Sequence, residues 1–120
     1  MKIEAQTIND RQLAEVISES VLITTPQEAL DLLADLYYQG FDGIMIYERN
    51  ITPTFFDLSS GLAGEILQKF SNYKIKLAII GEFSAYQGKS LKDFIYESNK
   101  LGNVNFVNSL EEAQIRLSRK

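Results

Sequence analysis

The stretch GIMIYERNITPTFFDLSSGLAGEILQKF, residues 43–70, decides the fold of this 120-residue chain. It begins with residues 43–47, a run that is apolar at nearly every position and is typical of a strand buried on both faces. A loop with unusual residues follows, and residues 62–70 complete the stretch as a helix. Because parallel strands are joined through such crossover units, the stretch predicts an α/β protein.

The N-terminal segment predicts a β-hairpin. Residues 2–8 and 13–18 show short alternating or β-branched character. Between them lie Asn9 and Asp10, a favourable turn pair. The first two strands are therefore expected to pair in antiparallel orientation.

Capping sequences mark where later helices begin. A Ser or Thr followed three positions later by an acidic residue can satisfy the free N–H groups of a helix start. Such sequences occur at residues 25–28, 90–93 and 109–112. Further buried strands are expected over residues 75–80 and 104–107.

The predicted order of elements is two strands, then helix and strand in alternation, ending on a helix. This order predicts a mixed, mostly parallel sheet of about five strands with about four helices, opened by the N-terminal hairpin. The length fits one domain over residues 1–120. Ligand sites in open α/β sheets lie beyond the carboxyl ends of the strands, so candidate residues are sought there.

Composition excludes several classes of function. The chain has no Cys and no His, which removes thiol nucleophiles, Ser-His arrangements and the usual structural zinc sites. We therefore expect no enzyme, no cofactor and no metal. A net charge of −4 argues against a nucleic-acid partner. No apolar run approaches the ~20 residues that span a bilayer, and the N-terminus does not resemble a signal peptide, so a cytoplasmic protein is expected.

Several segments resemble known families. Residues 51–53, 55–57, 61–70 and 90–99 resemble a bacterial family catalogued as a domain of unknown function, DUF 4180. Residues 50–52, 55–57 and 59–62 are also similar to the loop and helix start of anti-sigma-factor antagonists of the SpoIIAA type, the STAS domain. The first resemblance covers most of the chain and implies a fold family without an activity. The second implies a STAS-like fold.

The STAS resemblance implies a switch at the helix start. In that family a serine at this place is phosphorylated by a partner kinase, which makes Ser59 or Ser60, with Gly61, a candidate phosphoacceptor or anion-binding helix start. The sequence departs from the family pattern, because Leu58 stands before the serines and Ala63 replaces the second glycine. The alternative is that Asp57, Ser59 or Ser60 only caps the helix.

Two glycines accompany these serines. Gly61 and Gly64 are expected within the first turns of the helix, where glycine costs about 1 kcal/mol relative to alanine. We interpret them as sites of close backbone approach, to a strand of the same domain, a partner protein or an anion.

Polar residues after the strands suggest a pocket at the carboxyl edge. If the strands ending near Tyr47 and Ile80 are neighbours, the residues that follow them lie close together. Paired carboxylates there can perform acid/base chemistry or bind a hard cation, although loop carboxylates are often only solvated. The candidate pocket residues are Glu48, Asn50, Asp57, Glu82 and Ser84.

Aromatic loop residues offer a different site. Phe55 and Phe56 lie in the loop after Pro53, and Tyr86 lies in a later loop. If one Phe is exposed beside Tyr86, the patch suits a protein partner or a homodimer. The alternative is that both rings fill the core under their loop.

These observations favour a small regulatory or adaptor module that acts by protein binding, with a STAS-like switch at Ser59 and Ser60. The alternative is a domain that binds a small molecule or a cation at the carboxyl edge through Glu48, Asn50, Glu82 and Ser84.

Overall fold

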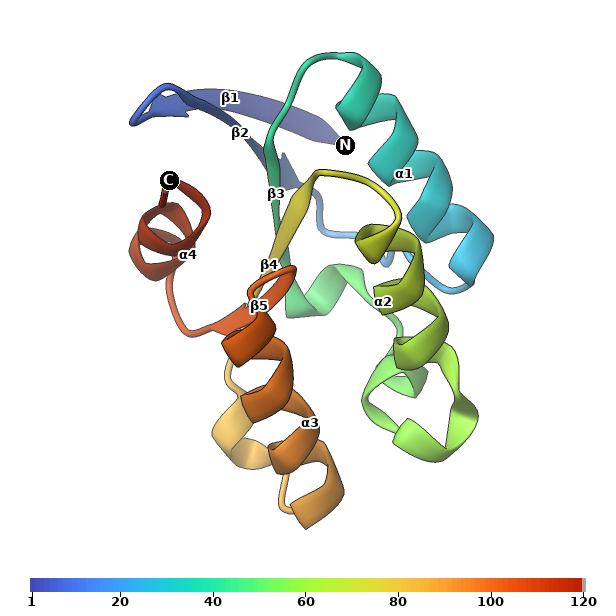
Figure 1. The fold of residues 1–120 in the computed structure, drawn as a ribbon. Coiled ribbons are helices and arrows are strands. Elements are labelled where there is room, and N and C mark those ends of the chain that lie inside the picture. Colours follow the sequence, from blue (N-terminus) through green and yellow to red (C-terminus); the bar gives the residue numbers. More distant parts are fainter. Residues whose placement is uncertain (120) are drawn as a thin grey trace.

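A five-stranded mixed sheet forms the centre of the computed structural model, which describes residues 1–119 (Figure 1). The strands lie side by side in sequence order. The first two are antiparallel and the other neighbours are parallel, which confirms the predicted mostly parallel sheet. The strands are β1 (Lys2–Ile8), β2 (Arg11–Ile17), β3 (Gly43–Tyr47), β4 (Lys76–Ile80) and β5 (Val104–Val107).

The N-terminal hairpin turns as its sequence predicts. Asn9 and Asp10 both have positive φ, 51° and 66°. A two-residue turn with positive φ at both positions matches the twist of the strands that it joins. The second strand begins at Arg11, two residues earlier than the sequence pattern suggested.

Four α-helices cover the sheet within the described residues, unequally on its two faces (Figure 1). Three pack on one face around Ile44, Ile46, Leu77 and Ile79, and the fourth packs alone on the other face around Met45 and Ala78. The alternation of β3 between these two cores explains why its sequence is continuously apolar. The helices are α1 (Pro26–Tyr38), α2 (Leu62–Ser71), α3 (Lys89–Leu101) and α4 (Leu110–Leu117).

Two of the three predicted helix caps are present. The hydroxyls of Thr25 and Ser109 accept hydrogen bonds from the backbone N–H groups of Glu28 and Glu112, both at 3.1 Å. The cap expected at Ser90 is wrong, since α3 begins one residue earlier, after Gly88, without a side-chain cap. Its first turn instead carries an exposed ion pair between Lys89 and Asp93.

Side chains of α3 close the outer edge of β5. The Asn99 amide donates to the Phe106 carbonyl at 3.2 Å and accepts from the Phe106 N–H at 2.7 Å. The Ser98 hydroxyl donates to the Val104 carbonyl at 2.6 Å. These side chains bond the backbone groups that a sixth strand would otherwise use.

Candidate functional site

The candidate site is the loop that joins β3 to α2, together with the loop after β4. The register pairs Tyr47 with Ile80, so the two loops leave the sheet side by side as expected. Three short 3₁₀ turns make up the first loop, Glu48–Asn50, Pro53–Phe56 and Leu58–Ser60. The Thr52 hydroxyl accepts from the Thr54 N–H at 3.4 Å, and Pro53 provides the fixed φ that suits a turn start.

Asn50 holds this loop to the rest of the domain. Its side chain is fully buried, donates to the carbonyls of Ser18 and Ser20 at 2.8 and 2.9 Å, and accepts from the Tyr47 N–H at 3.3 Å. These bonds occupy both N–H groups and the oxygen of the amide. The structure therefore places the predicted pocket residue Asn50 in the framework under the loop.

Glu48 links the two loops. Its carboxylate accepts from the Glu82 N–H at 3.1 Å and from the Tyr86 hydroxyl at 2.5 Å. Burial, followed by the hydrogen bond to the Glu48 carboxylate, raises the pKa of Tyr86 to about 12, so this phenol is a donor at neutral pH. Gly81 makes the link possible, because a Cβ at that position would lie 2.7 Å from the Glu48 Cβ.

The predicted pair of carboxylates does not share one pocket. Glu82 caps its own turn by accepting from the Ser84 N–H at 3.4 Å and from the Ser84 hydroxyl. A hollow of about 310 Å³ does lie at this edge, but Glu48 and Arg49 line it with apolar and aromatic neighbours, without Asn50, Glu82 or Ser84. The carboxylate in this lining belongs to Glu48, which already accepts hydrogen bonds from the Glu82 N–H and the Tyr86 hydroxyl.

The aromatic residues of the loop fill the core. Phe55 and Phe56 are only 1% and 7% exposed, so the condition for the candidate interface, an exposed Phe beside Tyr86, is not met. The Phe56 ring stacks on Tyr86 at 5.0 Å, and Phe55 packs against Phe106. Both rings belong to the larger hydrophobic core, as in the alternative in which they fill the core under their loop.

The helix start carries exposed polar side chains. Asp57, Ser59 and Ser60 are all exposed. The Asp57 carboxylate accepts from the Ser59 N–H at 3.2 Å and from its hydroxyl at 2.6 Å. The Ser60 hydroxyl donates to the Thr54 carbonyl at 3.0 Å and accepts from the Leu62 N–H at 3.2 Å. Asp57 caps the 3₁₀ turn Leu58–Ser60, whereas α2 begins after Gly61 without a side-chain cap, so the alternative in which one of these residues caps the helix is wrong. The three side chains remain exposed.

The expectation of close backbone approach at the two glycines is wrong. A Cβ at Gly61 or Gly64 would meet nothing within 4 Å. Gly61 precedes α2 with φ of 79°, a left-handed conformation that favours glycine. Gly64 is exposed in the first turn of the helix, where no neighbour requires a glycine.

Comparison with known proteins identifies the family. The family model described as Domain of unknown function (DUF4180) matches residues 8–117. The chain belongs to this family. The match confirms the resemblance to this family that the sequence indicated. No curated protein and no solved structure is significantly similar to the chain.

Metal and membrane binding were also considered for this DUF4180 chain. Within residues 1–119, no group of three or more His, Cys, Asp or Glu side chains is arranged to hold a metal ion. Over the same residues, no helix has the length and apolar character needed to cross a membrane.

Sequence reasoning missed one buried carboxylate. Glu15, in the middle of β2, is only 7% exposed and accepts from the Gln6 amide at 3.1 Å and the Tyr47 hydroxyl at 2.8 Å. Burial, followed by this hydrogen bond, raises the pKa of Tyr47 to about 12. A Gln114 side chain from α4 reaches Gln6 at 2.6 Å and extends the network. The signal was an acidic residue within residues 13–17, which are otherwise apolar.

Proposed function

We propose that this domain is a non-catalytic regulatory module that presents residues 57–61 to a protein partner. The observation that carries the proposal is a loop that is exposed at its tip and fixed at its base. Asp57, Ser59 and Ser60 are exposed, whereas Asn50, Phe55 and Phe56 are buried immediately before them. A loop that is already ordered loses little conformational entropy when a partner binds.

Ser60 is the residue that best fits a phosphorylation switch. Phosphorylation would remove its hydroxyl bond to the Thr54 carbonyl and would place a dianion beside the Leu62 N–H, at the start of α2. Helix N-termini stabilise such anions. At Ser59 the same group would lie against the Asp57 carboxylate, which accepts the Ser59 hydroxyl at 2.6 Å, and like charges would repel.

The bonding of the loop carboxylates supports a role without turnover. Glu48 accepts bonds from Glu82 and Tyr86, and Glu82 accepts bonds from Ser84. A general acid or base must reach a substrate proton. Here Glu48 instead links two loops, and Glu82 caps its own turn.

Partner capture tests this proposal. Tagged protein carrying Ser60→Ala or Ser60→Glu is expressed in the native host, and captured proteins are compared with those of the unchanged chain. We expect the two variants to differ in at least one captured protein. Alanine cannot be phosphorylated, whereas the negative charge of glutamate imitates a phosphate. Ser90→Ala and Ser90→Glu are matched controls, since Ser90 is exposed in the first turn of α3.

Phosphopeptide mapping of the unchanged protein from the same cells gives an independent measurement. Phosphate at Ser60 supports the switch. Identical captured proteins for all variants, together with no phosphate at Ser59 or Ser60 under stress conditions, would contradict it.

The hollow beside Glu48 favours a second candidate, the binding of a small molecule. Its volume of about 310 Å³ and the guanidinium of Arg49 over the Tyr47 ring, 4.5 Å from the centroid, offer room and a charged group. A thermal-shift screen tests it, because a ligand that binds only the folded state raises the melting temperature with concentration. Loss of the shift in Arg49→Gln would support this site over another.

A further inference from the structure

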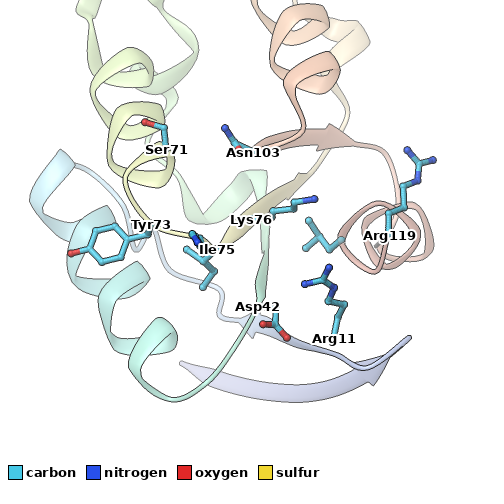
Figure 2. Close-up of a pocket in the computed structure, with 10 residues that line it drawn as sticks. Arg11, Asp42, Ser71, Tyr73, Ile75, Lys76, Asn103 and Arg119 are labelled. Carbon is cyan, nitrogen blue, oxygen red and sulfur yellow. The ribbon is translucent and has the colours of Figure 1, made fainter.

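A second hollow, of about 350 Å³, lies at the opposite edge of the sheet, where the parallel strands begin (Figure 2). Its lining comes from the start of β2, the connection between α2 and β4, the residue before β5 and the end of α4. Four of the chain's 12 Lys and Arg residues line it, namely Arg11, Lys74, Lys76 and Arg119.

Strand register explains why these cations converge. Leu13 pairs with Gly43, which pairs with Lys76, so these positions share one face of the sheet. Arg11 lies two residues before Leu13 and therefore emerges on that face too. Neighbouring strands are about 4.8 Å apart and two residues along a strand add about 6.6 Å, so Arg11 and Lys76 leave the sheet about 12 Å from each other. Gly43, on the strand between β2 and β4, has no side chain to fill the space near Lys76. Arg119, two residues beyond the end of α4, also lines the hollow (Figure 2).

Within residues 1–119, the lining of this hollow carries more positive than negative charge. Asp42 is the only carboxylate in its lining, and it accepts from the Gln12 N–H at 2.8 Å. Among residues 1–119, no ion pair includes Arg11, Lys74, Lys76 or Arg119. The cluster also opposes the overall charge of −4. Clefts lined by one sign of charge concentrate ligands of the opposite sign.

The remaining lining residues suit the organic part of a small ligand. Ile75 and Leu117 are buried side chains of the wall, and Asn103 contributes a polar amide. Tyr73 points its hydroxyl away from the other labelled side chains and packs edge-on against Tyr37 at 5.5 Å, so it adds an apolar surface (Figure 2). The volume falls within the range of small-ligand sites, about 300–1,000 Å³.

We propose that this hollow binds a small organic anion that carries a phosphate or carboxylate group. Arg11 and Lys76 donate to the anionic group, because guanidinium and ammonium groups form the strongest hydrogen bonds with such oxygens. Ile75 and Leu117 contact the organic part. This site is separate from residues 57–61, so it does not depend on the function proposed above.

The competing explanation is that these cations only neutralise helix ends. α2 and α4 end beside the hollow, and basic residues stabilise helix C-termini. The two explanations predict opposite effects of charge removal on the ligand-free protein. If the cations stabilise a helix end, removing one should lower the stability of the ligand-free protein. If they form an anion site, they repel each other while the site is empty, so removing one should not lower it.

Calorimetric titration with phenyl phosphate, inorganic phosphate and benzoate at low salt tests the proposal. We expect saturable one-to-one binding of phenyl phosphate, stronger than that of inorganic phosphate because of the apolar wall. Comparing phenyl phosphate with benzoate distinguishes a phosphate ligand from a carboxylate ligand. Arg11→Gln and Lys76→Gln are each expected to weaken binding about tenfold.

The matched control is Lys92→Gln, which removes one exposed charge from α3 away from this lining. It is expected to leave binding unchanged. The melting temperature of ligand-free Lys76→Gln is expected to stay at or above that of the unchanged protein. Absence of saturable binding by all three probes, equal weakening by Lys92→Gln, or a lowered melting temperature of ligand-free Lys76→Gln would each overturn the proposal.

Discussion

The two ends of the parallel strands differ in how their charged groups are used. At the carboxyl edge, the side chains of Glu48 and Asn50 bond to neighbouring loops, and that of Glu82 caps its own turn. At the amino edge, Arg11 and Lys76 have no ion-pair partner in the described chain. Ligand sites are expected at the carboxyl edge, but the polar groups named there hold the loops in place. The excess of positive charge lies at the amino edge instead.

The largest loss of stability is expected when the buried amide at the carboxyl edge is removed. Asn50→Ala deletes three hydrogen bonds and leaves the carbonyls of Ser18 and Ser20 without this donor. We expect unfolding free energy to fall by about 3 kcal/mol, measured by urea denaturation. Asn72→Ala, at the exposed end of α2, is the control and should change stability by less than about 0.5 kcal/mol. A similar small effect for Asn50→Ala would contradict a structural role.

A smaller effect is expected from Gly81→Ala. The new methyl group would lie 2.7 Å from the Glu48 Cβ and would displace that carboxylate from Glu82 and Tyr86. Destabilisation of about 2 kcal/mol is expected from the steric conflict and the lost bonds.

The matched control for Gly81→Ala is Gly64→Ala, where a Cβ meets open space. Within a helix this exchange should stabilise the fold by about 0.5–1 kcal/mol. Equal effects of the two substitutions, in the same denaturation experiment, would show that Glu48 does not need the space at Gly81.

Alkaline pH should weaken the phenol bonds of both Tyr47 and Tyr86. Their pKa values are raised from 10.0 to about 12 in the folded protein, so their stabilisation is complete below pH 10 and is lost as the pH rises toward 12. The double variant Tyr47→Phe/Tyr86→Phe should lose stability less steeply over this interval. Denaturation at several pH values measures both slopes, and parallel slopes would argue against the raised pKa values.

The smallest effect is expected at the amino edge. Lys76→Gln removes a charge without breaking an ion pair within residues 1–119, so the ligand-free protein should keep its stability or gain no more than about 0.5 kcal/mol. Glu48→Gln provides the comparison at the other edge and should destabilise by about 1–2 kcal/mol, because it weakens two charge-assisted bonds. The contrast between the edges fails if Lys76→Gln is the more destabilising variant.

The sequence was sufficient for features set by local pattern. The hairpin turn at Asn9 and Asp10 and the caps at Thr25 and Ser109 depend on residues within a few positions of each other. The same local patterns predicted which segments along the chain form strands and which form helices. The strand over residues 104–107 was predicted with its observed bounds for the same reason.

Features set by distant contacts could not be predicted in this way. The partners of Asn50 lie 30 and 32 residues away, so nothing near it indicates that its amide is already bonded. The burial of Phe55 and Phe56 depends on rings such as Phe106 and Tyr86 that arrive from other elements. The basic hollow likewise required the strand register, which brings Arg11 and Lys76 to one face.

Asn99 has a consequence for how this protein meets other copies of itself. Its amide imitates the backbone of an adjoining strand by both donating to and accepting from Phe106. An unpaired sheet edge is a template on which further chains can add and grow into fibres. Asn99, together with Ser98, occupies that template from within the same chain, so α3 leaves the bonded groups of β5 unavailable to a strand from another copy.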